Sequence, residues 1–205
     1  MPQIAGLDVS RETIERLEVY SNLLIKWNAS INLVSKLTIP DLWNRHIADS
    51  AQLLCWDVPI KADWIDIGSG GGLPGIVVAA ILKETDPSAK VTMVESDQRK
   101  SAFLRVAATT LDLQVGIIAE RAETLEPAHA NVLSARALMS LDGLLSLGKR
   151  HILQDGCLLL LKGRSFQDEI EQARQNWHFD VVERPSITDN EAKMLQIRNI
   201  ERANA

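Results

Sequence analysis

Residues 66–76 have the sequence DIGSGGGLPGI, in which five glycines lie between positions 68 and 75. The loop follows a short apolar stretch and precedes a longer one, as in a strand–loop–helix unit. Glycines at such a turn permit positive φ angles and let the backbone approach a ligand. Gly70, Gly72 and Gly75 match the dinucleotide-binding spacing, and Glu95 follows about twenty residues later, as that pattern requires. The loop therefore predicts a nucleotide-like ligand, with tight packing alone as the lesser alternative.

The charges around this loop favour one class of ligand. No lysine lies in the loop to contact phosphate, which argues against a P-loop. Asp66 would repel a pyrophosphate but favours S-adenosylmethionine, which carries a sulfonium and an ammonium. Glu95 can accept hydrogen bonds from both ribose hydroxyls, and Ala122 and Glu123 follow the third predicted strand, where they could lie beside the adenine. We therefore expect S-adenosylmethionine, and a nicotinamide-dependent oxidoreductase is the alternative that the glycine spacing leaves open.

The apolar pattern predicts an α/β protein with N-terminal helices. Ser10 is the expected N-cap of a helix over 11–27, and Pro40 begins a second helix over 40–56. From residue 63, short apolar runs alternate with helical stretches, which is typical of a mostly parallel sheet covered on both faces. The last two strands lack a long helix between them and predict an antiparallel hairpin. We expect one globular unit, with residues 1–60 as a helical extension packed on the core of residues 61–205.

Composition limits the class of protein. Hydrophobic residues make up 46% of the 205 residues, charged residues 24%, and the formal net charge is −5. This balance excludes a uniformly basic nucleic-acid coat but allows a local basic face. Cys55 and Cys157 match no metal-ligand spacing, so no metal site is expected. No apolar run reaches membrane-spanning length, and residues 1–20 lack a signal-peptide pattern. We expect a cytoplasmic monomer that contacts no membrane.

Several further motifs accompany the glycine loop. They are VESDQRKSAFL, ERAETL, SARAL and LLLLKGR, with WNASINLVS and LWNRHIADS upstream. Together with DIGSGGGLPGI, they resemble the bacterial small-subunit ribosomal RNA methyltransferase G family, also called glucose-inhibited division protein B. The glycine loop alone is common to many methyltransferases, whereas its Leu-Pro-Gly end and the upstream motifs are more specific. The resemblance runs from about residue 20 to the LLLLKGR motif, with a looser match to the end of the chain.

The resemblance implies a class I S-adenosylmethionine-dependent methyltransferase, with a Rossmann-like seven-stranded sheet and a reversed final hairpin. It implies methyl transfer to N7 of one guanine in 16S rRNA of the small ribosomal subunit. It carries over Gly68, Leu73, Ala122, Glu123 and Arg136 as cofactor contacts. With the positions argued above, the predicted cofactor site is Asp66, Gly68, Gly70, Leu73, Glu95, Ala122, Glu123 and Arg136. Glu95 stands where many members have aspartate, which preserves the ribose role.

Methylation of guanine N7 is compatible with a sequence that shows no motif for a catalytic base or nucleophile. N7 has an in-plane lone pair and loses no proton when it is methylated. The transfer needs an in-line arrangement and an ordered substrate rather than a base or a nucleophile. We therefore expect no catalytic residue in the usual sense. RNA binding needs cations, and Lys162 and Arg164 directly follow a strand. The predicted RNA contacts are Arg45, His46, Lys100, Arg136, Lys162 and Arg164.

Two other functions stay open at this point. A methyltransferase of the same fold that acts on a small molecule or a protein would suit the negative net charge. A non-catalytic RNA-binding module would bind RNA without transferring a methyl group.

Overall fold

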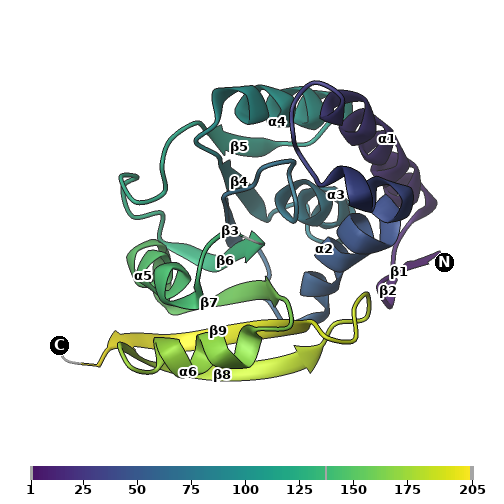
Figure 1. Ribbon diagram of the computed structural model, residues 1–205. Helices are drawn as coiled ribbons and strands as arrows, with labels where there is room; N and C mark the ends of the chain where they lie inside the picture. Colours follow the sequence, from purple (N-terminus) through teal and green to yellow (C-terminus); the bar gives the residue numbers. More distant parts are fainter. Residues whose placement is uncertain (1, 137, 204–205) are drawn as a thin grey trace.

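A seven-stranded sheet forms the centre of the protein in the computed structural model, which describes residues 2–136 and 138–203 (Figure 1). The strand order is β5-β4-β3-β6-β7-β9-β8. The parallel strands are β3 (Asp63–Ile67), β4 (Lys90–Val94), β5 (Val115–Ile118), β6 (Ala130–Arg136) and β7 (Ile152–Lys162). The antiparallel strands are β8 (Trp177–Pro185) and β9 (Lys193–Arg202). The reversed final hairpin on an otherwise parallel sheet confirms the predicted fold class.

Helices cover both faces of this sheet (Figure 1). One face is covered by α3 (Gly75–Thr85) and α4 (Gln98–Thr110), and the other by α5 (Leu141–His151) and α6 (Phe166–Ala173). Successive strand residues point to opposite faces, so that Trp64 joins the first core cluster and Ile65 the second. Among the described residues, no helix combines the length and apolar character needed to cross a membrane.

The N-terminal residues add a short hairpin and a long helix. The hairpin consists of β1 (Gln3–Ile4) and β2 (Leu7–Asp8). Helix α1 (Arg11–Asn28) begins where the sequence predicts, because the Ser10 hydroxyl accepts a hydrogen bond from the Thr13 amide at 2.9 Å. Leu17 and Leu24 are fully buried in the same core cluster as side chains of α3 and α4. This extension therefore buries its apolar side against the sheet-covering helices.

Residues 41–55 are helical without a break, but their hydrogen-bond spacing is not that of the single α-helix that the sequence predicts over 40–56. They lie in η1 (Lys36–Asp41), the wide π turn η2 (Trp43–Ala48), α2 (Asp49–Ala51) and η3 (Gln52–Cys55). This helical segment also contacts distant parts of the chain, because the main-chain oxygen of Arg45 accepts a hydrogen bond from Arg136. Gln52 is likewise tied to Ser186, in the connection between β8 and β9. Wide turns of this type are common at functional sites.

Candidate functional site

The glycine loop lies where the strand order reverses, between β3 and β6, at the carboxyl ends of the parallel strands. In open α/β sheets, this is where ligands bind. The Gly68 amide donates to the main-chain oxygen of Val94 at 2.9 Å, which holds the loop against the end of β4. Gly68 has a φ of 68°, and a Cβ atom there would overlap the side chain of Leu138. The positive φ therefore favours glycine at this position.

Asp66 differs from the sequence prediction of a carboxylate that faces the ligand. Its side chain is fully buried within the sheet, where it accepts hydrogen bonds from the Ser134 hydroxyl at 2.7 Å and the Gly75 amide at 3.2 Å. It therefore joins β3 to β6 and to the start of α3. Burial raises the pKa of Asp66 to about 6, an effect that the hydrogen bonds from Ser134, Ser69 and Gly75 oppose. The carboxylate lines neither of the cavities described next.

A smaller cavity of about 330 Å³ opens beside the ends of β3, β4 and β5. Apolar side chains from Ile67, Val94, Leu138 and Leu147 line part of it, and acids and bases line the rest. The predicted cofactor residues that line this cavity are Gly68, Gly70, Glu95, Ala122, Glu123 and Arg136. Leu73 lines the larger cavity instead. The structure thus brings six of the eight predicted cofactor positions to one cavity.

Glu95 is held in place by backbone amides at the edge of the smaller cavity. One carboxylate oxygen accepts from the Gly70 amide at 2.8 Å, and the other accepts from the Asp97 amide at 2.8 Å. The side chain is only 7% exposed. Each carboxylate oxygen has a further lone pair, so both oxygens can accept from a pair of ligand hydroxyls without moving.

The end of helix α5 supports the loop that carries Ala122 and Glu123. The Nε2 atom of His151 donates to the main-chain oxygen of Ala122 at 2.8 Å. Arg150 donates twice to the main-chain oxygen of Leu125, at 2.9 and 2.7 Å. His151 is fully buried, and burial lowers the pKa of its ring. The sequence does not indicate this supporting role, because neither residue lies in a motif or beside the loop in sequence.

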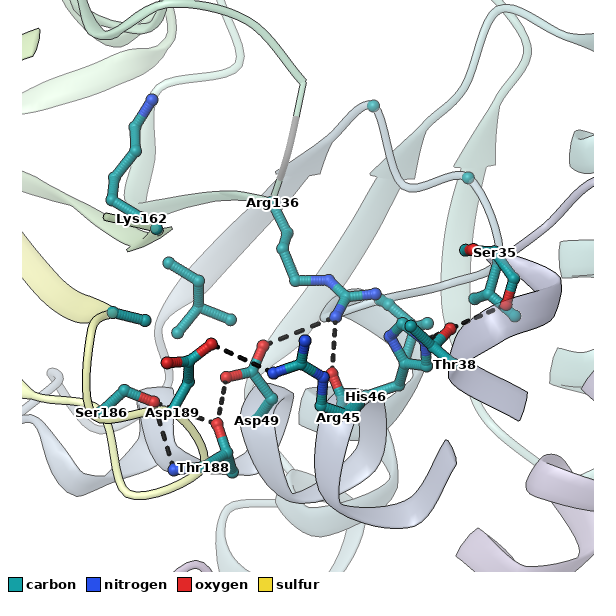
Figure 2. A pocket seen from close by; sticks show the side chains of 18 of the residues that line it. Ser35, Thr38, Arg45, His46, Asp49, Arg136, Lys162, Ser186, Thr188 and Asp189 are labelled. Atoms are coloured by element: carbon teal, nitrogen blue, oxygen red, sulfur yellow. Dashed lines mark hydrogen bonds and ion pairs between the residues drawn. The ribbon is translucent and has the colours of Figure 1, made fainter. Parts of the chain in front are cut away.

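A larger cavity of about 640 Å³ adjoins the smaller one, and Gly68, Gly70, Lys100, Arg136 and Met139 line both. Besides the glycine loop and residues of α4 and α6, three distant parts of the chain line the larger cavity (Figure 2). These are the segment from Leu33 to Asp49, the ends of β6 and β7, and the connection between β8 and β9.

Five of the six predicted RNA contacts line the larger cavity, namely Arg45, His46, Lys100, Arg136 and Lys162. Arg164 does not line it. The Arg164 side chain is 80% exposed and pairs with Glu191 at 2.5 Å. Lys162 is only 8% exposed, and its ammonium donates to Glu169 at 2.7 Å and to the main-chain oxygen of Met139 at 3.1 Å. Lys162 thus also anchors the segment between β6 and α5.

Polar contacts join the three parts of the larger cavity (Figure 2). Arg136 donates to the main-chain oxygen of Arg45 at 3.1 Å and lies 3.5 Å from Asp49. The other oxygen of Asp49 accepts from the Thr188 hydroxyl at 2.7 Å. Burial raises the pKa of Asp49, while Thr188 and Arg136 oppose that rise. Arg45 also pairs with Asp189 at 3.0 Å. The guanidinium of Arg136 therefore lies at the junction of both cavities.

Asp49, Thr188 and Asp189 are site residues that the sequence prediction does not include. Asp49 lies within the motif LWNRHIADS, about one helical turn after Arg45 and His46, and this spacing is a signal for it in the sequence. Thr188 and Asp189 lie in the C-terminal segment that matches only a general strand pattern.

Among residues 2–136 and 138–203, no group of three His, Cys, Asp or Glu side chains could hold a metal ion. Ala137 of the SARAL motif lies outside the described residues.

Known proteins resemble this chain in sequence over nearly its full length. The sequence model of a family described as rRNA small subunit methyltransferase G (GidB) matches residues 13–200. A protein of Ruegeria sp. (strain TM1040) named ribosomal RNA small subunit methyltransferase G is 47% identical over 196 residues, which are 96% of this chain and 95% of that protein. A protein of the same name from Paracoccus denitrificans (strain Pd 1222) is 45% identical over 96% of this chain and 100% of its own length.

Solved structures share the fold at low sequence identity. A ribosomal protein L11 methylase from Lactobacillus delbrueckii subsp. bulgaricus superimposes with a TM-score of 0.58 at 16% identity, over 75% of this chain and 77% of its own. A SAM-dependent methyltransferase from Aquifex aeolicus superimposes with a TM-score of 0.57 at 12% identity, over 79% of this chain and 94% of its own. The sheet order and these neighbours identify the fold as that of class I methyltransferases. From the sequence match over residues 13–200 and the near full-length relatives, we conclude that the chain belongs to the rRNA small subunit methyltransferase G family.

Proposed function

We propose that this protein transfers a methyl group from S-adenosylmethionine to N7 of a specific guanine in 16S rRNA of the small ribosomal subunit. The observation that carries the proposal is the pair of adjoining cavities that meet at Arg136. The smaller one suits a nucleoside-like donor, and the larger one, rimmed by cations, suits an RNA base. The names of the relatives, ribosomal RNA small subunit methyltransferase G, support rRNA as the substrate.

The residues of the smaller cavity fit S-adenosylmethionine. Its apolar side chains can cover a purine, while the fixed carboxylate of Glu95 can accept from ribose hydroxyls. The amino-acid part of the cofactor carries both an ammonium and a carboxylate, which suits a cavity lined by acidic and basic side chains. The basic side chains include Lys100 and Arg136. When bound, the cofactor supplies an electrophilic methyl group on its sulfonium. The role of this chain is to hold that group at the junction of the cavities.

The larger cavity provides donors for an RNA strand. Arg45, Lys100, Lys162 and Lys193 all line it. Guanidinium and ammonium groups position a nucleic acid mainly through its phosphates. Met139 and Leu161 provide apolar surface that a base can contact. Because N7 carries a free lone pair, the chain needs to align the base and exclude water, and no side chain has to remove a proton.

We further propose that the protein acts as a monomer in the cytoplasm, where its ribosomal substrate would be found. Residues 1–60 then act as a helical extension of the core of residues 61–205, and its residues from 33 to 49 form one wall of the larger cavity. Sedimentation of the purified protein would test this part, and a stable dimer would contradict it.

Mapping 7-methylguanosine in 16S rRNA from cells with and without the protein tests the main proposal. We expect one guanine to lose its methyl group in the deletion strain and to regain it after complementation. An unchanged modification pattern would refute the proposal.

Calorimetric titrations separate the alternatives: binding of NAD without binding of S-adenosylmethionine would favour an oxidoreductase. Methylation of free small molecules but not of ribosomal subunits would favour another substrate class, and RNA binding without methyl transfer would favour a non-catalytic module.

A further inference from the structure

Tyr20 is the only tyrosine of the chain, and it lies in the middle of helix α1. Its side chain is fully buried and lines neither of the two cavities. The hydroxyl nevertheless reaches the glycine loop, where it donates a hydrogen bond to the main-chain oxygen of Gly71, 51 positions away in sequence. A residue of the N-terminal extension therefore holds the loop from within the core.

The three consecutive glycines of the loop need such a contact. Gly71 is flanked by Gly70 and Gly72, whose φ angles of 55° and 86° lie in the left-handed region. Glycines have few conformational preferences of their own, so their peptide groups rotate easily unless other groups hold them. In the part of the chain that the structure describes, no other group donates to the oxygen of Gly71. The Tyr20 hydroxyl thus sets the orientation of the peptide group between Gly71 and Gly72.

The hydroxyl of Tyr20 can only act as the donor in this contact, because a main-chain oxygen offers no proton. Burial raises the pKa of Tyr20 above its usual value, with Arg136 opposing this rise and Asp66 adding to it. The hydroxyl therefore stays protonated at neutral pH, and the hydrogen bond is always available there.

The same glycines hold the carboxylate that can accept from the ribose. The Gly70 amide donates to one oxygen of Glu95 at 2.8 Å. Only one peptide group lies between this amide and the peptide group whose oxygen binds Tyr20. If the oxygen of Gly71 loses its donor, the glycines can turn and the Gly70 amide can leave its place against Glu95. The buried hydroxyl is therefore linked to the ribose acceptor through two hydrogen bonds and a short stretch of glycine backbone.

Apolar side chains pack against the same point of the loop. A Cβ atom on Gly71 would lie 3.3 Å from Cβ of Leu33 and 3.5 Å from Cδ1 of Leu24. The loop backbone thus lies directly on α1 and the segment that follows it. This packing limits movement of the loop toward α1, while the hydrogen bond from Tyr20 sets the direction of the peptide group.

We propose that Tyr20 is a positioning residue for S-adenosylmethionine, whose hydroxyl holds the glycine loop in the conformation in which Gly70 fixes Glu95 for the ribose hydroxyls. The inference rests on the proposed placement of the cofactor in the smaller cavity. It gives the N-terminal extension a role in cofactor affinity, besides its contribution to the wall of the larger cavity.

The substitution Tyr20→Phe tests the hydroxyl alone, because it keeps the ring in the core. Calorimetric titration with S-adenosylhomocysteine, the product form of the cofactor, should show a Kd raised about 10-fold. The kcat for rRNA at saturating S-adenosylmethionine should change little. Trp177→Phe is the control, since it removes the buried indole N–H that donates to Asp142 at 2.9 Å, from a side chain that lines neither cavity. It should lower the melting temperature, as Tyr20→Phe does, but leave Kd unchanged.

A cofactor analogue provides a readout that a loss of stability would not change. 2′-Deoxy-S-adenosylhomocysteine lacks one ribose hydroxyl, and we expect the wild-type protein and Trp177→Phe to bind it about 10-fold more weakly than S-adenosylhomocysteine. In Tyr20→Phe this penalty should fall to about 3-fold, because Glu95 is no longer held in place. An unchanged Kd in Tyr20→Phe, or an equal penalty in all three proteins, would overturn the inference. The expected penalties without any methylation of rRNA by the wild-type protein would support the inference and refute the proposed function.

Discussion

The Nη1 atom of Arg136 donates to the main-chain oxygen of Arg45 at 3.1 Å, although 91 positions separate the two residues in sequence. This bond joins the end of β6, beside the smaller cavity, to the π turn that forms one wall of the larger cavity. Arg136 therefore aligns the two cavities with each other.

Replacing Arg136 with lysine should reduce rRNA methylation about 10-fold or more. The shorter lysine side chain does not carry its ammonium to the position of Nη1, the atom that contacts both the main-chain oxygen of Arg45 and the carboxylate of Asp49. Single-turnover methylation and melting temperature should be measured together, with Arg11→Lys as a control, because the Arg11 side chain is 85% exposed on α1. Full activity in Arg136→Lys would show that alignment does not depend on the guanidinium.

Replacing Gly68 with aspartate should abolish binding of S-adenosylmethionine. The φ of 68° is unfavourable for a side chain, a Cβ would overlap Leu138, and the carboxylate would enter the smaller cavity. Gly163→Ala is the matched control, since a Cβ at Gly163 meets nothing within 4 Å. Calorimetric titration should detect binding for the control only. Near wild-type affinity in Gly68→Asp would contradict the assignment of the smaller cavity.

Replacing Lys162 with alanine should weaken rRNA methylation about 10-fold while affinity for S-adenosylmethionine changes little. The slope of log affinity against log salt should fall by about one unit if the ammonium contacts a phosphate. Glu169→Gln is the control, because it disturbs the same internal ion pair but leaves the lysine charge available. Equal effects of both substitutions would indicate that Lys162 only anchors the segment between β6 and α5.

Replacing His151 with leucine should raise KM for S-adenosylmethionine about 3-fold to 10-fold and leave kcat for rRNA nearly unchanged. The substitution removes the donor to Ala122 and leaves that main-chain oxygen unpaired in the loop beside the smaller cavity. His151→Gln can still donate from its amide and should restore part of the affinity. A fall in kcat with KM unchanged in His151→Leu would argue against a role in cofactor affinity.

Asp66 should make stability depend on pH. Its folded-state pKa of about 6 lies above the usual value of 3.8, so the folded protein binds this proton more tightly than the unfolded chain. Below about pH 3.8, Asp66 contributes about 3 kcal/mol to the free energy of unfolding, and this contribution is lost as the pH rises through about 6. Asp66→Asn does not titrate. Urea unfolding should therefore show the variant gaining stability relative to wild type between about pH 4 and 7, and a constant difference would refute the prediction.

Local sequence signals predicted the sheet and most of the site well. Ser10 caps α1 as expected because capping depends only on neighbouring residues. Gly68, Gly70, Glu95, Ala122 and Glu123 meet at one cavity because all follow parallel strands, whose carboxyl ends share one edge.

Long-range contacts explain what the sequence could not reveal. The helix expected over 40–56 changes its hydrogen-bond spacing along its length, and Arg45 and Gln52 within it bond to residues far away in sequence, which local signals do not indicate. The buried position of Asp66 depends on Ser134, its partner on the neighbouring strand β6. Arg164 follows β7 as predicted, yet it pairs with Glu191 outside the cavities, a contact that strand position alone does not indicate.

The contacts of Asp49 with Thr188 and of Arg45 with Asp189 span 139 and 144 positions of the chain. The larger cavity is therefore completed only after nearly the whole polypeptide has left the ribosome, whereas the glycine loop and the residues of the smaller cavity emerge earlier. A chain that stops before residue 188 lacks this wall and cannot assemble the full cavity.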